Sequence, residues 1–168
     1  LSLIKSGEKL ESNPVGLKFF NVYGPNENHK DKMASVIYHF NNQLITEGSI
    51  KVFGGSHGFS AGEHLRDFIE VNNAVDLTIW LSERDANHSG IYNCGTGTAR
   101  SFNNVANLVI KWHKRGVIKY VEFPPKLLPF YQPHTCADLL KIISLGYNPQ
   151  FKNLEEGVND YLNWLNGD

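Results

Sequence analysis

An α/β fold with at least some parallel sheet is predicted by the alternation of strand-like and helix-like segments along the chain. Short runs rich in aromatic and β-branched residues, such as 16–23 and 90–94, are typical of strands. Other segments, such as 102–112, carry apolar residues at the spacing of one helix face. With 168 residues, 41% hydrophobic and 20% charged, the chain has the composition of one globular domain.

The first third of the chain predicts a strand, a helix and a second strand. Residues 16–23 end at a Gly-Pro pair, which is typical of a strand that runs into a turn. Apolar residues at helical spacing predict a helix over 33–44, with Asp31 as its N-cap and Gly48 beyond its end. Residues 50–53 form the second predicted strand.

The middle of the chain predicts a long loop, a strand and a helix. Residues 54–64 contain four glycines and no regular apolar spacing, which indicates a loop. The strand-like pattern resumes at 66–71, and Asn72 or Asn73 can cap a helix that extends to about Glu83. Loops as long as 54–64 are usually functional or mobile, so this segment is a candidate part of a site.

A strand at 90–94 is predicted next, followed by a Gly-Thr-Gly turn at 95–97. Ser101 caps the helix over 102–112, and Gly116 is placed to accommodate its left-handed end. Cations in the last turn of this helix favour the negative end of its dipole. Both ends of the helix can therefore be located from local residues.

The last third of the chain predicts a strand at 118–123 and, at 124–134, an irregular segment with four prolines. Proline lacks a backbone N–H, so this segment is unlikely to lie inside a sheet. Asn153 is the expected cap of a final helix over 154–165, whose first turn is acidic.

Overall charge and cysteine content argue against several classes of protein. Sixteen Lys and Arg against 17 Asp and Glu give a formal net charge of −1, so bulk charge indicates neither a nucleic acid nor a membrane as partner. Cys94 and Cys136 lie far apart without a Cys-x-x-Cys motif, which predicts ordinary thiols in a reducing cytoplasm. His57, Glu63 and His64 lack the spacing of a metal site, and no apolar run reaches the roughly 18 residues of a membrane span.

Three motifs offer chemistry, each with a plainer alternative. The turn at 95–97 precedes a helix and can present N–H groups to a phosphate, but it also suits a tight structural turn. The charged run at 29–32 is either a solvated surface or a site in which Lys30 transfers a proton. Arg66 can take a phosphate bidentately, or it forms an ion pair with Asp67 or Glu70.

An aromatic side chain in the proline-rich segment is a fourth candidate. Tyr131 can stack on a sugar or donate a hydrogen bond to it. Its plainer alternative is a surface aromatic residue packed against the fold.

Three motifs in order resemble the second half of an extended short-chain dehydrogenase/reductase of the nucleotide-sugar epimerase and dehydratase type. They are Phe-Asn-Val-Tyr-Gly-Pro at 20–25, Arg-Asp-Phe-Ile-Glu-Val at 66–71 and Tyr-Asn-Cys-Gly-Thr-Gly at 92–97. Finer similarities, including the His-Lys pair at 29–30 and Met-Ala-Ser-Val at 33–36, resemble the ADP-L-glycero-D-manno-heptose 6-epimerase family. This resemblance extends over nearly all of the chain.

The resemblance implies a cofactor, a reaction and a set of site residues. Tightly bound NADP removes a hydride from C6 of the heptose and returns it to the opposite face of a 6-keto intermediate. Lys30 matches an acid/base group and, with Val22, lies beside the cofactor. The implied substrate contacts are Asn21, Lys32, His39, Phe53, Gly54, Gly55, Ser56, Arg66 and Tyr131. Lys32 stands where the family has a serine, because Lys-Gly-Ser-Met in the family is Lys-Asp-Lys-Met here.

The parts of the family that bind the dinucleotide do not occur in this sequence. It has neither the glycine-rich motif nor a Tyr-x-x-x-Lys pair. By resemblance, residues 1–168 are therefore the C-terminal half: the end of a Rossmann-type parallel sheet and the smaller α/β substrate-binding domain. Leu1 is expected to be a break inside a longer enzyme whose absent N-terminal half binds most of the NADP. The fragment alone is expected to be inactive.

The expected function is epimerisation of an ADP-heptose at C6 for the lipopolysaccharide inner core, in the bacterial cytoplasm. Expected partners are the ADP-sugar and further copies of the protein in a homo-oligomer, with no nucleic acid, membrane or metal. Another nucleotide-sugar epimerase or dehydratase of the superfamily is one alternative. A non-catalytic nucleotide-sugar-binding module is the other, favoured for this chain by itself because the upstream motifs are missing.

Overall fold

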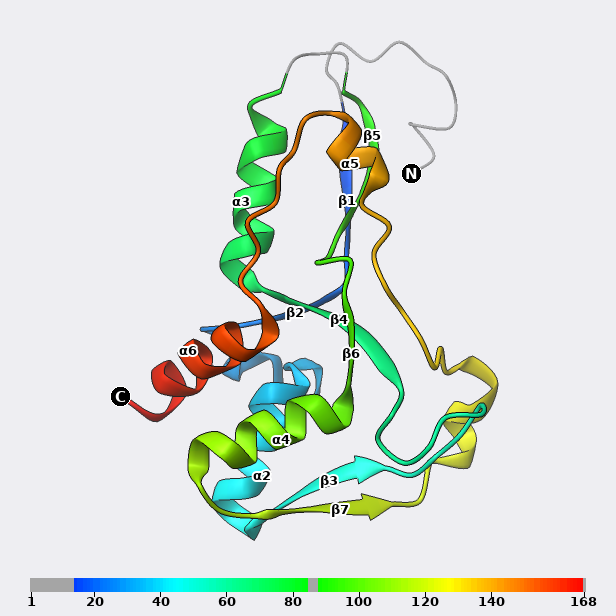
Figure 1. Ribbon diagram of the computed structural model, residues 1–168, viewed down its shortest axis with the longest axis vertical. Coiled ribbons are helices and arrows are strands. Elements are labelled where there is room, and N and C mark those ends of the chain that lie inside the picture. Colours follow the sequence, from blue (N-terminus) through cyan, green and yellow to red (C-terminus); the bar gives the residue numbers. More distant parts are fainter. Residues whose placement is uncertain (1–13, 85–87, 168) are drawn as a thin grey trace.

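The computed structural model describes residues 14–84 and 88–167 (Figure 1). Its buried apolar residues form two separate cores. The described strands form three small sheets, with orders β1-β5, β2-β4-β6 and β3-β7. All of these pairings are parallel except the antiparallel pairing of β4 with β6. The predicted α/β fold with parallel strands is confirmed. The expected break at Leu1 lies outside the described residues.

The first core lies between a parallel pair of strands and two helices. β1 (Val15–Phe19) pairs with β5 (Gly90–Cys94), and α3 (Val71–Ser82) and the short α5 (Leu140–Ser144) lie near them (Figure 1). Its buried residues are Ile69, Ala74, Leu77, Leu81, Tyr92, Cys94 and Ile142. The five-residue helix α5 was not predicted, because it is too short to show a helical period.

The second core is larger and lies among three helices and a second parallel pair of strands. Its elements are α2 (Val36–Glu47), β3 (Ser49–Phe53), α4 (Phe102–His113), β7 (Val117–Val121) and α6 (Leu154–Asn166). β3 and β7 pair in parallel and lie below α4 in the view of Figure 1. The predicted caps Ser101 and Asn153 are confirmed, since each side chain accepts a hydrogen bond from the first turn of its helix.

A central sheet joins the two halves of the molecule (Figure 1). It consists of β2 (Asn21–Tyr23), β4 (Leu65–Glu70) and β6 (Ala99–Ser101). The strand predicted at 16–23 is in fact two strands, because the chain changes partners at Phe20. The Phe20 N–H still donates to Cys94 on β5, and its carbonyl turns back to accept from Val22 at 2.9 Å.

The predicted start of the first long helix is wrong. Asp31 does not cap it; the helix begins at Val36, and the Ser35 side chain accepts a hydrogen bond from the Tyr38 N–H at 3.3 Å. Met33 lies outside the helix and is 84% exposed. It belongs to the 3-10 helix η1 (Asn28–Met33), in which Asp31 has a φ of 46°.

Two further caps also differ from the predictions. Neither Asn72 nor Asn73 caps α3; Glu70, the last residue of β4, accepts from the Asn72 N–H at 3.0 Å and takes that role. A long carboxylate that reaches over the first turn replaces the expected short side chain. At the end of α4 the left-handed cap is Lys114 (φ 54°), two residues before Gly116.

The two irregular segments lie against each other. Within 54–64 the structure has no helix or extended strand, and the proline-rich segment is irregular apart from the 3-10 helix η2 (Pro125–Phe130), as predicted. The His57 Nε2 lies 3.0 Å from the Leu128 carbonyl of η2. Beyond η2 the chain runs along β4, where Leu65 donates to the Pro133 carbonyl at 2.9 Å.

Candidate active-site pocket

A pocket of about 280 Å³ lies between α2, β3, β4 and the segment that follows η2. Helix α2 contributes residues spaced three and four apart, which is one face of the helix. The lining residues are Val36, His39, Phe40, Gln43, Lys51, Val52, Phe53, Gly62, His64, Arg66, Phe102 and Tyr131. Four of the residues predicted from the resemblance, His39, Phe53, Arg66 and Tyr131, therefore line one pocket.

Arg66 is a cation of this pocket that lies against aromatic rings. Its guanidinium lies 4.8 Å from the centre of the Tyr131 ring and 5.7 Å from that of Phe102. Its Nη1 donates to the Leu65 carbonyl at 2.8 Å. Among residues 14–84 and 88–167, no carboxylate forms an ion pair with Arg66. The alternative of an ion pair with Asp67 or Glu70 is therefore not observed, and the charge is available to an anion.

Aromatic rings form the wall of the pocket around Tyr131. The Tyr131 ring lies 4.8 Å from the Phe123 ring and 5.0 Å from the His64 ring, both nearly edge-on. Burial raises the pKa of the Tyr131 hydroxyl, although the nearby Arg66 opposes this. The hydroxyl therefore stays protonated near neutral pH and can donate a hydrogen bond to a ligand.

His64 is a lining residue that sequence reasoning did not assign to the site. It is 1% exposed, and its Nε2 lies 2.8 Å from the Ser56 hydroxyl and 3.2 Å from the Ser56 carbonyl. These contacts hold the glycine-rich loop against the pocket. The only signal in the sequence was a histidine directly before a buried strand, and such a residue is usually structural.

The buried His64 makes folding depend on pH. Burial lowers its pKa, the Ser56 hydrogen bond opposes this, and the charge of Arg66 lowers it further. The unfolded chain therefore binds more protons than the folded chain as the pH falls below about 6.5, so stability decreases there. We expect the midpoint temperature of thermal unfolding to decrease when the pH is lowered from about 7.5 to about 5.5, a range that includes the ordinary histidine pKa.

The variant His64→Gln provides the control for this prediction. Burial also lowers the pKa of His113, so part of the pH dependence should persist in the variant. A pH dependence equal to that of the unchanged protein would show that His64 does not contribute.

A second pocket of about 370 Å³ adjoins the first and contains two more of the predicted residues. Asn21 and Val22 of β2 line it together with Ala34 and Ser35. Val36 and Phe102 line both pockets, so these two side chains form the boundary between them. Val22 is half-buried, which suits an apolar contact with a flat ring.

The other predicted residues lie near the pockets without lining them. Lys30 and Lys32 are exposed on η1. Gly54, Gly55 and Ser56 begin the loop after β3 and shape it; a Cβ on Gly55 would lie 2.6 Å from the Phe59 carbonyl. The roles assigned to these five residues, like those assigned to the residues that line the pockets, stay predictions.

The turn at 95–97 is structural. Its Thr96 and Gly97 N–H groups each donate to the buried Asp67 carboxylate at 2.8 Å. The Thr96 hydroxyl and the Ala137 N–H donate to the same carboxylate at 2.6 and 3.0 Å. The N–H groups that could have bound a phosphate are therefore occupied by Asp67.

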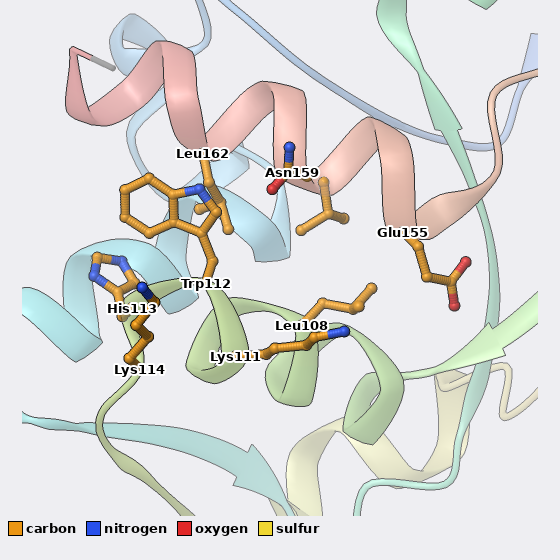
Figure 2. A pocket seen from close by; sticks show the side chains of 9 residues that line it. Leu108, Lys111, Trp112, His113, Lys114, Glu155, Asn159 and Leu162 are labelled. Carbon is orange, nitrogen blue, oxygen red and sulfur yellow. The ribbon is translucent and has the colours of Figure 1, made fainter.

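A larger hollow of about 620 Å³ lies between α4 and α6, away from these residues. Figure 2 shows Trp112 and Leu162 between the two helices, with Glu155 to their right. The Trp112 Nε1 donates to Asn163 at 2.7 Å, so the indole contributes to packing of the two helices. None of the residues implied by the resemblance lines this hollow.

Two further observations apply to the described part of the chain. No three His, Cys, Asp or Glu side chains there come together as a possible metal site. None of its helices is both long enough and apolar enough to cross a membrane.

The chain resembles a curated enzyme over almost all of its length. It is 46% identical over 155 residues to the ADP-L-glycero-D-manno-heptose-6-epimerase of Alkalilimnicola ehrlichii, which covers 92% of this chain and 48% of that protein. The chain therefore spans about half the length of this relative.

Solved structures show the same fold. The ADP-L-glycero-D-manno-heptose-6-epimerase of Helicobacter pylori matches with a TM-score of 0.81 and 28% identity, over 99% of this chain and 48% of that one. A UDP-N-acetylglucosamine 4-epimerase from Methanobrevibacter ruminantium, 24% identical, matches with a TM-score of 0.80 over 99% of this chain and 50% of that one. The NAD dependent epimerase/dehydratase family matches over residues 3–95 of the 168. The chain thus belongs to the NAD dependent epimerase/dehydratase family.

Proposed function

We propose that this chain is the substrate-binding half of an enzyme that epimerises ADP-D-glycero-D-manno-heptose to ADP-L-glycero-D-manno-heptose at C6. The position of Arg66 carries this proposal, because its guanidinium lies among aromatic rings in a pocket, forms no ion pair among residues 14–84 and 88–167, and suits a diphosphate. The 46% identity to an ADP-L-glycero-D-manno-heptose-6-epimerase supports the choice of sugar.

The two adjoining pockets suggest how the substrate is divided between them. The pocket of about 280 Å³, with its aromatic wall, takes the nucleoside diphosphate, and Arg66 binds the phosphates. The sugar extends past Val36 and Phe102 into the pocket that contains Asn21 and Val22. The exposed Lys30 approaches the sugar once the other half of the enzyme covers η1, and it transfers a proton at the C6 oxygen.

NADP is the cofactor that we propose. The half-buried Val22 fits one face of a nicotinamide ring, and Lys30 lies on the segment that follows β2. When bound, NADP would supply reversible hydride transfer at C6 of the sugar. The sequence holds no glycine-rich dinucleotide motif, so the remaining contacts belong to a half of the enzyme outside this chain.

Because the other half of the enzyme would supply part of the binding site, we predict that this chain alone binds the substrate weakly. We propose that residues 1–168 share the pocket with a dinucleotide-binding half in a cytoplasmic homo-oligomer that serves lipopolysaccharide inner-core synthesis. Calorimetric titration of the isolated chain with an ADP-sugar should give weak or no binding. Micromolar affinity would contradict the shared pocket and favour an independent binding module.

A comparison of substrates tests the proposed reaction. The full-length protein that contains this chain should epimerise ADP-heptose and leave UDP- and dTDP-hexoses unchanged. Turnover of a UDP-hexose in preference to ADP-heptose would assign the protein to another epimerase or dehydratase of the family.

Replacing Arg66 by lysine tests the phosphate contact. Lysine keeps the charge but loses the bidentate geometry, worth about 1.5–3 kcal/mol for hydrogen bonds to charged groups, so KM for the ADP-sugar should rise about 10- to 100-fold. Arg84→Lys is the matched control, because Arg84 also lies over an aromatic ring, 4.3 Å from the centre of Trp80, but does not line either pocket. Equal KM values for the two variants would remove Arg66 from the site.

A further inference from the structure

A buried carboxylate joins the two ends of the segment that carries Lys30. Glu27 is 3% exposed and directly precedes η1. At the far end of the segment, the Ser35 N–H donates to Glu27 Oε2 at 2.6 Å and the Ser35 hydroxyl donates to Oε1 at 2.5 Å. Residues 28–34 are therefore closed into a loop by one side chain.

A helix from the other end of the chain completes this arrangement. The Tyr161 hydroxyl of α6 donates to Glu27 Oε1 at 2.6 Å. Tyr161 is 2% exposed in the second core, where burial and then the Glu27 hydrogen bond raise its pKa, so it remains a donor. In the described part of the chain no cation forms an ion pair with Glu27, so donated hydrogen bonds stabilise the buried charge.

The backbone inside the closed loop is strained next to Lys30. Asp31 has φ 46° and ψ −124°. The Asp31 conformation is one that glycine adopts readily and other residues avoid. Such a conformation persists only when surrounding contacts impose it, and it clusters at functional sites. The contacts that close this loop are those of Glu27, together with the Lys30 N–H donating to the Glu27 carbonyl at 3.0 Å.

We propose that Glu27, held by Ser35 and Tyr161, is a positioning residue that sets where Lys30 is presented to the sugar. The proposal rests on the proposed function of Lys30. Glu27 lines neither pocket, so it acts through the loop rather than on the substrate. Ser35 does line the pocket of about 370 Å³, so the same contacts also fix that wall.

The variant Tyr161→Phe tests the proposal in the full-length protein, because it removes one hydrogen bond and keeps the ring. We expect kcat to fall about 10-fold and KM for the ADP-sugar to stay within about twofold, as for the loss of one hydrogen bond to a charged group. Trypsin should cleave after Lys30 and Lys32 faster, measured by mass spectrometry against cleavage after Lys119 of β7. Tyr147→Phe, in the first core, is the matched control and should change none of these values.

A double variant separates positioning from a general structural effect. If Glu27 and Tyr161 act through Lys30, Tyr161→Phe should lower kcat no further in a Lys30→Ala background. A further loss there, or unchanged kcat and cleavage in Tyr161→Phe, would overturn the proposal. Glu27→Gln is the second variant and should repeat the faster cleavage, because an amide N–H₂ group cannot accept the donated hydrogen bonds.

Epimerisation rate and tryptic cleavage separate a failure of this proposal from a failure of the proposed function. If Lys30→Ala leaves epimerisation unchanged, the assigned role of Lys30 is wrong and the positioning proposal is overturned with it. Cleavage after Lys30 and Lys32 still decides whether Glu27 and Tyr161 hold the loop.

Discussion

The variant Lys30→Ala is expected to lower kcat of the full-length enzyme about 10²- to 10⁴-fold, the range for loss of a general acid or base. Lys30 is exposed on η1 in this chain, so its removal should leave the thermal unfolding midpoint unchanged. The effect should lie in kcat and not in KM, because a proton-transfer group acts in the transition state. Steady-state epimerisation of ADP-heptose measures both values.

Lys119→Ala is the matched control for this prediction. Lys119 is an exposed lysine on β7 that lines neither pocket. Epimerisation by Lys30→Ala at the rate of Lys119→Ala would show that the charged run at 29–32 is only a solvated surface.

The variant Asp67→Asn is expected to destabilise the fold by about 2–6 kcal/mol, because the amide N–H₂ group leaves two donors without an acceptor at a cost of about 1–3 kcal/mol each. Asp67 is 0% exposed and accepts hydrogen bonds from Thr96, Gly97 and Ala137. It thereby joins β4 to the turn after β5 and to the segment before α5. An amide can accept at one atom only, and its N–H₂ group would face N–H donors.

The turn at Gly95 shows how closely these parts approach. A Cβ at Gly95 would lie 2.6 Å from the Ala137 Cβ and 2.7 Å from the Asp67 carboxylate. Glycine is therefore required by packing there, and Gly95→Ala should act in the same direction as Asp67→Asn.

Urea unfolding followed by circular dichroism measures the effect at Asp67. Asp76→Asn is the control, because Asp76 is an exposed aspartate on the neighbouring α3 and surface changes usually shift stability by at most about 0.5 kcal/mol. An unfolding free energy of Asp67→Asn equal to that of Asp76→Asn would contradict the role derived from the hydrogen bonds.

Two helix starts were predictable because each has one suitable capping residue directly before the apolar helical pattern. Ser101 and Asn153 cap their helices through bonds to residues three positions away, Asn104 and Glu156. The start of α2 was not predictable, because Asp31 is a common capping residue and nothing local distinguishes it from Ser35. Ser35 is the N-cap: its hydroxyl accepts a hydrogen bond from the Tyr38 N–H. The same hydroxyl donates to Glu27, eight residues earlier in the chain.

The sequence predicted several residues that line the candidate pocket, but it did not predict how they are arranged. The resemblance named His39, Phe53, Arg66 and Tyr131 as substrate contacts, and the fold brings them to one pocket. From the sequence alone, Arg66 could either bind a phosphate or form an ion pair with a neighbouring carboxylate. Tertiary structure bears on the ion pair only: in the described part of the chain no carboxylate pairs with Arg66, and the Asp67 carboxylate accepts hydrogen bonds from Thr96, Gly97 and Ala137.

The sequence by itself determined the α/β class, most strands and helices, and the family. These features depend on contacts between residues a few positions apart or on motifs that can be read in order. Only the tertiary structure decided which residues share a site and what holds them. The Glu27–Tyr161 bond joins residues 134 positions apart, and the bond from Ala137 to Asp67 spans 70. Such pairings follow from how the two cores pack, which no local pattern contains.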